Sequence, residues 1–236
     1  MKRIREVFGV DRVVLPVVHP IGLAEALASV EVARAAGAKG VFTINQGMND
    51  GEVLALVREI QRRYPELWVG VNLLGRSPTQ ALGDALDEGG RIDGIWSDNA
   101  LIDERAADQP AATEFMAARR ARGWTGLYFG GVAFKYQREV SADDLGRAAV
   151  LAMSYMDVVC TSGPGTGKAA DVSKVVAMRK AIGAEGAIAL ASGVTAENVS
   201  TYLPYVDVFL VGTGIEARFG VLDAAKLAAL LAAVGG

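Results

Sequence analysis

The sequence predicts a single (β/α)8 TIM barrel that spans residues 1–236. Three observations predict this fold class. Short apolar runs recur eight times along the chain, roughly every 28 residues, which is the repeat length of a barrel of this size. Stretches with helical periodicity separate these runs. In the last third of the chain, three successive runs each stop at a small-residue turn that precedes such a stretch.

The eight apolar runs are expected to be the strands. They are rich in Val, Ile, Leu and Phe and are closer to continuous apolar segments than to alternating ones, which is typical of parallel strands buried on both faces. The expected strands cover 12–18, 40–45, 67–73, 93–97, 126–134, 157–161, 187–191 and 207–211.

Helices are expected between the strands, with start and stop signals at their ends. Clear helical patterns cover 23–36, 50–64, 111–122, 172–182 and 223–234. Capping residues open four helical segments, at Asn49, at Ser77 before Pro78, at Ser141 and at Thr195. Gly37 and Gly183 are placed to end helices. An open doubly wound sheet is the alternative, but 18–22 reads Val-His-Pro-Ile-Gly and carries no glycine fingerprint after the first strand.

Composition narrows the function classes. The net charge is −3, whereas a nucleic-acid-binding protein needs a clustered basic face, so nucleic-acid binding is not expected. One cysteine excludes an intrachain disulfide framework. No apolar run approaches the roughly 18 to 20 residues of a membrane span, and Glu6 interrupts the basic start before any apolar segment. We therefore expect a cytoplasmic protein without membrane insertion and without nucleic-acid partners.

Metal and cofactor chemistry is not expected. His19 is the only histidine, which excludes sites built from several histidines. A carboxylate site for Mg²⁺ would have only Asp98, Asp103 and Glu104 nearby. The segment 163–168 is glycine-rich, but it departs from the P-loop pattern at Ser162 and Ala169. Cys160 lies inside an apolar run and is expected to be an inert buried thiol.

The last two turns predict a phosphate site. Parallel strands joined by crossovers place all such turns on one face of the sheet. In (β/α)8 barrels the loops after strands seven and eight commonly hold a phosphate on backbone N–H groups. The residues expected to bind it are Ser192, Gly193, Gly212 and Thr213.

Polar residues follow the other strands and are expected to line a site at the same rim. About half of them are expected to contact a ligand, and the others to cap helices or tie loops together. The residues expected to bind substrate are His19, Asn45, Asn72, Thr161 and Ser162. His19 is equally well read as a structural histidine or as a single acid or base.

Lys135 and Asp98 are the catalytic candidates. Lys135 follows a strand that contains Gly130 and Gly131, which indicate a close approach of something to that strand. Its ammonium would neutralise an anionic substrate or, if desolvated, act as a base or Schiff-base nucleophile. A surface lysine is the other interpretation. Asp98 suits a general base, a hydroxyl acceptor or a metal ligand, and an Asx turn is its structural alternative.

Several blocks resemble the BtpA/SgcQ family, a group of (β/α)8 proteins placed with the ribulose-phosphate-binding barrels. The blocks are 69–74 (VGVNLL), 92–98 (IDGIWSD), 157–163 (DVVCTSG) with 166–168 (TGK) and Asp171, 191–198 (ASGVTAEN) and 208–213 (VFLVGT). The resemblance runs from about residue 65 to the C-terminus. Where the family reads Asp-Val-His-Val-Lys-His, this chain reads Gly131-Val-Ala-Phe-Lys-Tyr136, which keeps the lysine and loses the acid and both histidines.

The resemblance implies a phosphate-binding barrel and attaches no reaction to it, because one member is linked to photosystem I biogenesis and others to sugar metabolism. Two functions are therefore expected from the sequence. The first is an enzyme, namely a lyase, isomerase or glycosyl transferase that acts on a phosphorylated sugar or nucleotide-like metabolite. The alternative is a non-catalytic assembly or regulatory protein. The alanine-rich segment 223–234 is a candidate surface for a homo-oligomer.

Overall fold

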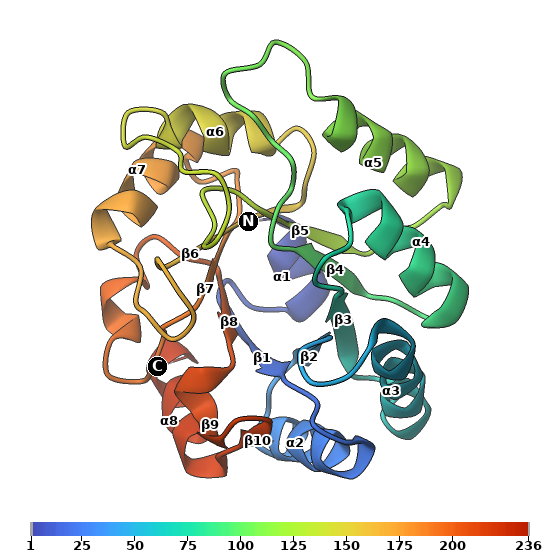
Figure 1. Cartoon of the computed structure of the whole chain (residues 1–236). Helices are drawn as coiled ribbons and strands as arrows, with labels where there is room; N and C mark the ends of the chain where they lie inside the picture. The colour runs from blue at the N-terminus through green and yellow to red at the C-terminus, as the bar shows by residue number, and fades with distance from the viewer. Residues whose placement is uncertain (1, 236) are drawn as a thin grey trace.

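Eight parallel strands close into a barrel in the computed structural model, which describes residues 2–235 (Figure 1). Strand β8 pairs back onto β1, with Val13 opposite Val208 and Pro16 opposite Val211. The strands are β1 (Val13–Val18), β2 (Gly40–Ile44), β3 (Trp68–Asn72), β4 (Gly94–Ser97), β5 (Leu127–Gly131), β6 (Val158–Ser162), β7 (Ile188–Ala191) and β8 (Val208–Val211). The predicted (β/α)8 barrel is confirmed, and each of the eight strands lies within the range expected for it or within one residue of that range.

Helices surround the barrel, and most begin where the sequence signals placed them. Asn49 and Ser77 each form a capping box with the residue three positions later. Gly183 ends a helix in a left-handed conformation, with φ 63°. The barrel helices are α2 (Leu23–Ala35), α3 (Asp50–Arg63), α4 (Pro78–Glu88), α5 (Pro110–Ala121), α6 (Leu145–Ala152), α7 (Val172–Ile182) and α8 (Ala224–Gly235).

Two connections differ from the expected pattern. The segment after β7, expected to start a helix at Thr195, forms only a 3₁₀ turn, η1 (Val199–Thr201). Asn198 closes this segment on itself, because its side chain accepts from Thr195 N–H and donates to the Gly193 carbonyl. After β8, a second 3₁₀ turn, η2 (Thr213–Ile215), and a short hairpin of β9 (Glu216–Arg218) and β10 (Val221–Leu222) precede α8.

Strand β5 is shorter than expected. It ends at Gly131 and not at 134, because Ala133 adopts a left-handed conformation with φ 48° that turns the chain. The close approach predicted at Gly131 is present, but the group that approaches belongs to the protein. A Cβ on Gly131 would lie 1.9 Å from the carbonyl oxygen of Asp98. Glycine at this position therefore lets the loop after β4 cross β5 directly.

The N-terminal helix α1 (Lys2–Phe8) closes the amino-terminal end of the barrel, across the opening seen in Figure 1. Ile4 and Phe8 are buried in the cluster that fills the barrel interior, and the Phe8 ring packs edge-on against Trp68 at the start of β3. Arg3 pairs with Asp157 just before β6. With this end covered, access to the barrel interior is from the carboxyl ends of the strands.

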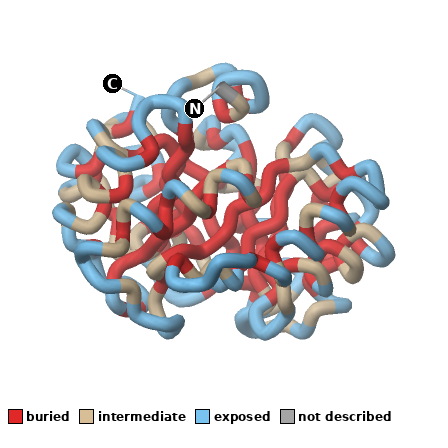
Figure 2. The backbone as a smooth tube through the Cα atoms, turned by 90° about the horizontal axis from the view of Figure 1, so that it is seen from above, coloured by how far each residue is buried: buried red, intermediate tan, exposed pale blue. Residues whose placement is uncertain are grey.

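The core has two parts. Alternate strand residues fill the barrel interior, where the rings of Phe42, Trp68 and Phe129 meet edge to face. The other strand residues pack against the helices in a larger cluster. Figure 2 shows the buried backbone concentrated in the strands and the exposed backbone at the periphery. No helix among residues 2–235 combines the length and apolar character needed to cross a bilayer.

Candidate functional site

A cavity opens at the carboxyl ends of the strands, where the sequence predicts the site. Its floor is the uppermost layer of the barrel interior, which contributes apolar side chains from five strands. Polar side chains from the loops form its wall. The floor residues are Val17, Ile44, Trp96, Ala191 and Leu210, and the wall includes His19, Asp98, Lys135, Ser192, Gly212 and Thr213.

The ammonium group of Lys135 lies at the junction of three loops. Its Nζ donates to Ser192 Oγ at 3.1 Å, after β7, and to Thr166 Oγ1 at 3.4 Å, in the loop after β6. The backbone N–H of Lys135 donates to Ser162 Oγ at 2.8 Å, which fixes the base of the side chain. No carboxylate in the described part of the chain lies within 4 Å of this ammonium, so its charge is surrounded by hydroxyl groups.

The turn after β7 is strained and tightly packed. Ser192 and Gly193 both have positive φ, 76° and 66°. A Cβ on Gly193 would lie 2.2 Å from the backbone N of Ala169, so this glycine lets the loops after β6 and β7 touch. A non-glycine residue held in the left-handed region costs on the order of 1–3 kcal/mol and persists where the surrounding structure enforces it. The Ser192 hydroxyl is thereby fixed in the cavity wall.

The turn after β8 completes this side of the cavity. Thr213 and Gly214 are the first residues after Gly212 in η2, and their N–H groups have no acceptor among the described residues. Thr213 Oγ1 lies close to Gly167, where a Cβ would be 3.7 Å away. Hydroxyl groups after β6, β7 and β8 are therefore gathered on one side of the cavity, next to Lys135.

Asp98 lies at the end of β4 and is half-buried. Its carboxylate accepts from Asn72 Nδ2 at 2.9 Å. Burial raises the pKa of Asp98, while the Asn72 hydrogen bond and the positive charge of Lys135 act in the opposite direction. The Asx turn considered for Asp98 is made by its neighbour Asn99, whose side chain accepts from Leu101 N–H at 2.8 Å. The Asp98 carboxyl is therefore free of a capping role and lines the cavity.

The side chains of four predicted site residues form hydrogen bonds within the protein, and these residues do not line the cavity. Asn45 joins the loops after β2 and β3, donating to Asp50 Oδ1 at 2.6 Å and accepting from Leu74 N–H at 2.5 Å. Asn72 is buried and orients Asp98. Thr161 donates to the Ala133 carbonyl, and Ser162 donates to the Gly163 carbonyl. Their hydrogen bonds fix the loops at the rim of the barrel. These residues would therefore affect ligand binding through the cavity residues that they position.

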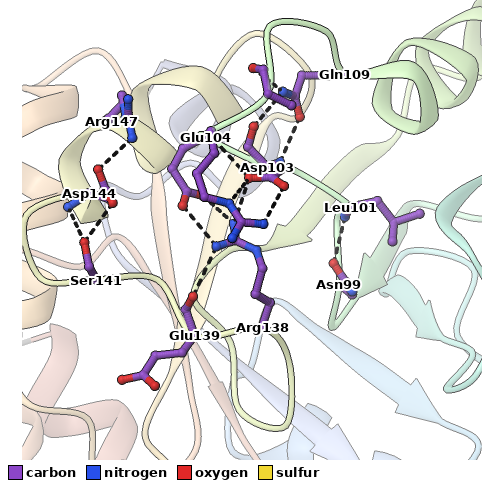
Figure 3. A network of polar contacts seen from close by, with 12 residues as sticks. Asn99, Leu101, Asp103, Glu104, Gln109, Arg138, Glu139, Ser141, Asp144 and Arg147 are labelled. Carbon is purple, nitrogen blue, oxygen red and sulfur yellow. Dashed lines mark hydrogen bonds and ion pairs between the residues drawn. The ribbon is translucent and has the colours of Figure 1, made fainter.

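An ion-pair network ties the loop after β4 to the loop that carries Lys135 (Figure 3). Arg138 forms ion pairs with the buried carboxylate of Glu104 and, at 3.5 Å, with Asp103. The Arg138 guanidinium lowers the pKa of Glu104. Asp103 is also held by Arg105. These two carboxylates, considered for a Mg²⁺ site with Asp98, thus serve as arginine partners that fix the β5 loop.

Half-buried Lys174 and fully buried Cys160 lie next to the strands that carry the site. Lys174 on α7 donates to the carbonyl of Ala133 and, at 2.9 Å, to that of Ser162, and burial lowers its pKa to about 8. It therefore holds the β5 turn that precedes Lys135. Cys160 is fully buried, and burial raises the pKa of its thiol well above the ordinary value.

Sequence reasoning missed several residues that line the cavity or contact its lining. Glu216, which contacts His19, lies in the β9–β10 hairpin. No sequence pattern predicted a hairpin between the last strand and the helix that follows it. Tyr136 is 75% exposed and its hydroxyl accepts from Thr166 N–H at 3.2 Å. Leu74 and Trp96 are apolar and look like core residues in the sequence. Gln46, which with Asn45 is among the polar residues that the sequence places after the second strand, does line the cavity.

The fold is shared with solved structures. Phosphoribosyl anthranilate isomerase from Thermus thermophilus is 17% identical over 94% of this chain and 98% of that chain, with a TM-score of 0.65. (S)-3-O-geranylgeranylglyceryl phosphate synthase from Thermoplasma acidophilum, in complex with sn-glycerol-1-phosphate, is 13% identical over 99% and 97%, with a TM-score of 0.66. A phosphoribosyl anthranilate isomerase in complex with reduced 1-(o-carboxyphenylamino)-1-deoxyribulose 5-phosphate is 17% identical over 94% and 99%, with a TM-score of 0.62.

No protein-family model and no curated protein matches the chain. The resemblance of its sequence blocks to the BtpA/SgcQ family therefore stays an expectation. At identities below 20%, the likeness to the solved structures establishes the (β/α)8 fold and leaves the function to the site.

Proposed function

We propose that the cavity binds a phosphorylated small molecule, either a phosphosugar or a nucleotide-like metabolite, and that the protein is an enzyme acting on it. One observation carries the proposal. The Lys135 ammonium lies in the cavity wall among the hydroxyl groups of Ser192 and Thr166 and has no carboxylate partner within 4 Å in the described chain. A half-buried cation with hydroxyl neighbours is a site for an anion, because charge-assisted hydrogen bonds to a phosphate are stronger than those between neutral groups.

The phosphate is placed between Lys135 and the turns after β7 and β8. Ser192 and Thr213 supply hydroxyl donors there, and the N–H groups of Thr213 and Gly214 have no acceptor in the described chain. Two of the similar barrels were solved with phosphorylated ligands, one with sn-glycerol-1-phosphate and the other with a reduced deoxyribulose 5-phosphate derivative, which supports a phosphorylated ligand for this fold. The apolar floor beneath Lys135 suits the carbon skeleton of such a ligand.

Asp98 and Lys135 are proposed to do the chemistry. The Asp98 carboxyl lines the cavity, and burial raises its pKa, so it is proposed as the group that accepts or donates a proton. Lys135 would balance negative charge that develops on the substrate. This pair suits isomerisation, aldol cleavage or glycosyl transfer. A Schiff base on Lys135 is the covalent version of the same proposal, and borohydride trapping with a carbonyl substrate would detect it.

A thermal-shift panel tests the proposal. It compares phosphorylated compounds with their unphosphorylated counterparts, such as glycerol 1-phosphate with glycerol and ribose 5-phosphate with ribose. A ligand at about 100 times its Kd adds about 2.7 kcal/mol to the free energy of unfolding and raises the Tm. We expect shifts from phosphorylated members only. Equal shifts from both members of each pair, or none from any, would contradict a phosphate site.

A further inference from the structure

His19 lines the cavity beside the β8 turn and is paired with a buried carboxylate, Glu216, that lies outside the cavity lining. His19 follows β1 and Glu216 opens β9, and the His19 Nδ1 to Glu216 Oε1 distance is 2.8 Å. The two residues are only 7% and 6% exposed. They are separated by 197 positions in the sequence and meet because β8 pairs with β1.

The surroundings of Glu216 determine which proton lies between the two side chains. Its Oε1 also accepts from Gly220 N–H at 3.1 Å. Lys226 binds the backbone carbonyl of Glu216, at 2.7 Å, and not its carboxylate. Among the described residues, His19 is therefore the side-chain donor available to this buried carboxylate. A buried carboxylate needs donors, so Nδ1 carries a proton directed to Glu216.

The ring of His19 is fixed on two further sides. Phe219 stacks on it, with the centroids 5.2 Å apart and the planes 25° apart. Its Cε1 lies against Gly212, where a Cβ would be 2.5 Å away. Nε2 has no hydrogen-bond partner among the described residues, and His19 lines the same cavity as Lys135 and Asp98. Nε2 is thus the ring nitrogen that remains for a ligand.

We propose that His19 is a second acid–base group of the site, oriented by Glu216, and that it contacts the phosphorylated ligand through Nε2. This inference rests on the proposed function. Nε2 accepts a proton from a C–H group next to the ligand's carbonyl, and the electron pair of that bond stays on the ligand as an enediolate. The resulting imidazolium is balanced by the Glu216 carboxylate, and the proton then returns to the ligand.

The position of His19 separates its role from that of Asp98. His19 follows β1 and Asp98 follows β4, so the two groups lie on different sides of the cavity. Lys135, after β5, lines the same cavity. Two acid–base groups on different sides of one substrate are what a proton transfer between two atoms needs. Among the reaction classes considered, this arrangement favours isomerisation.

Because His19 is the only histidine of the chain, nitrogen NMR reports on it without assignment. The full chain labelled with ¹⁵N-histidine gives one pair of ring signals in a long-range ¹H–¹⁵N spectrum. We expect Nδ1 to be protonated throughout and Nε2 to be unprotonated in the neutral ring. A neutral ring protonated at Nε2 would overturn the proposed orientation, and this measurement needs no variant.

Titration with ribulose 5-phosphate, which carries both a phosphate and a carbonyl group, is followed on the His19 ring signals and on backbone amides and then separates this inference from the proposed function. We expect the Nε2 signal and the amide signals of Ser192 and Thr213 to move together. If the amides move and Nε2 does not, the acid–base role of His19 is overturned while the phosphate site stands. If neither moves, the proposed function fails and this inference fails with it.

Two variants, Glu216→Gln and His19→Gln, and one control, Glu114→Gln, complete the test. Glu216→Gln should produce a mixture of both tautomers at His19, while Glu114→Gln, on the exposed face of α5, should leave the ring signals unchanged. His19→Gln should bind phosphate but should slow deuterium uptake from D₂O into ribulose 5-phosphate by about 100-fold or more. Uptake at the wild-type rate in His19→Gln, or no uptake by the wild type at saturating ribulose 5-phosphate, would overturn the proton-transfer role.

Discussion

The Lys135 ammonium donates to Ser192 Oγ at 3.1 Å and so joins the loop after β5 to the turn after β7. Both ends of this contact are held by backbone that departs from ordinary conformations. Ala133, two residues before Lys135, and Ser192 itself have positive φ, 48° and 76°. The other two non-glycine residues with positive φ in the described chain, Leu101 and Tyr136, also lie in loops after β4 and β5. Backbone strain in non-glycine residues is thus confined, in the described chain, to loops that follow the carboxyl ends of the strands, and two of the four residues, Tyr136 and Ser192, line the cavity.

The strain at Ser192 can be separated from the use of its hydroxyl. Ser192→Gly should stabilise the protein by about 1 kcal/mol relative to Ser192→Ala, because glycine adopts φ 76° freely and alanine does not. Both variants lose the hydroxyl and should bind phosphate more weakly than the wild type. Urea unfolding and calorimetry measure the two effects. Equal stability of the two variants would show that Ser192 is not strained, and unchanged affinity would remove its hydroxyl from the phosphate site.

Gly193 should be intolerant of any side chain. Gly193→Ala combines a positive φ with a Cβ placed 2.2 Å from the backbone of Ala169, so it should displace the loop after β6. Gly183→Ala is the matched control, since its φ of 63° is similar and nothing lies within 4 Å of its Cβ. We expect the control to lose about 1 kcal/mol and Gly193→Ala to lose clearly more in urea unfolding. Equal losses would mean that the contact between the two loops yields easily.

The barrel could be predicted from the sequence because its signals are local and repeated. The run that forms β8 ends at a glycine turn, and the capping patterns at Asn49 and Ser77 predict the starts of α3 and α4. Helix α1 gave no such signal, since its burial depends on Ile4 and Phe8 meeting the open end of a barrel formed by distant strands. The turn after β7 was expected to be helical because Thr195 and Asn198 resemble a cap, yet Asn198 bonds within the turn.

The site was predicted in outline, since residues that directly follow strands must lie at the rim. Lys135, Asp98, His19 and Ser192 do line one cavity. Sequence position could not show which way an amide or hydroxyl is directed. Asn45 and Thr161 follow their strands as Asp98 does, but their hydrogen bonds go to neighbouring loops. Glu216 could not be found, because its partner His19 is brought to it only by closure of the barrel.

Lys174 should make stability depend on pH in the alkaline range. Burial lowers its pKa from 10.5 to about 8, so between these values the unfolded chain binds the proton more than the folded chain does. Below pH 8 the charged Lys174 side chain therefore lowers the free energy of unfolding. This destabilisation disappears as the pH rises toward 10.5, and the free energy of unfolding rises by up to about 3 kcal/mol. The wild type should gain stability relative to Lys174→Met between pH 7 and pH 10 in urea unfolding.

Lys39→Met removes an exposed lysine at the opposite end of the barrel and serves as the control for Lys174. Its stability relative to the wild type should stay constant over the same pH interval. A constant difference for Lys174→Met as well would show that the Lys174 ammonium is not desolvated in the folded protein.

Cys160 should be unreactive in the folded protein. It is fully buried, and burial raises its thiol pKa well above the ordinary value, so the thiolate that reacts is scarce and shielded. Because the chain has one cysteine, a colorimetric thiol reagent reports on this position alone. Modification should require unfolding and should become fast in concentrated urea. Rapid modification under native conditions would show that β6 opens to solvent.

The central claim is that Lys135 makes this cavity a phosphate site, and calorimetric titration with glycerol 1-phosphate tests it most directly. The wild type, Lys135→Gln and Lys39→Gln are compared, the last removing the same charge far from the cavity. Loss of a charge-assisted hydrogen bond should weaken binding by about 10- to 100-fold in Lys135→Gln. Lys39→Gln should bind like the wild type, and glycerol should not bind at all. Equal affinity of the wild type and Lys135→Gln would contradict the account.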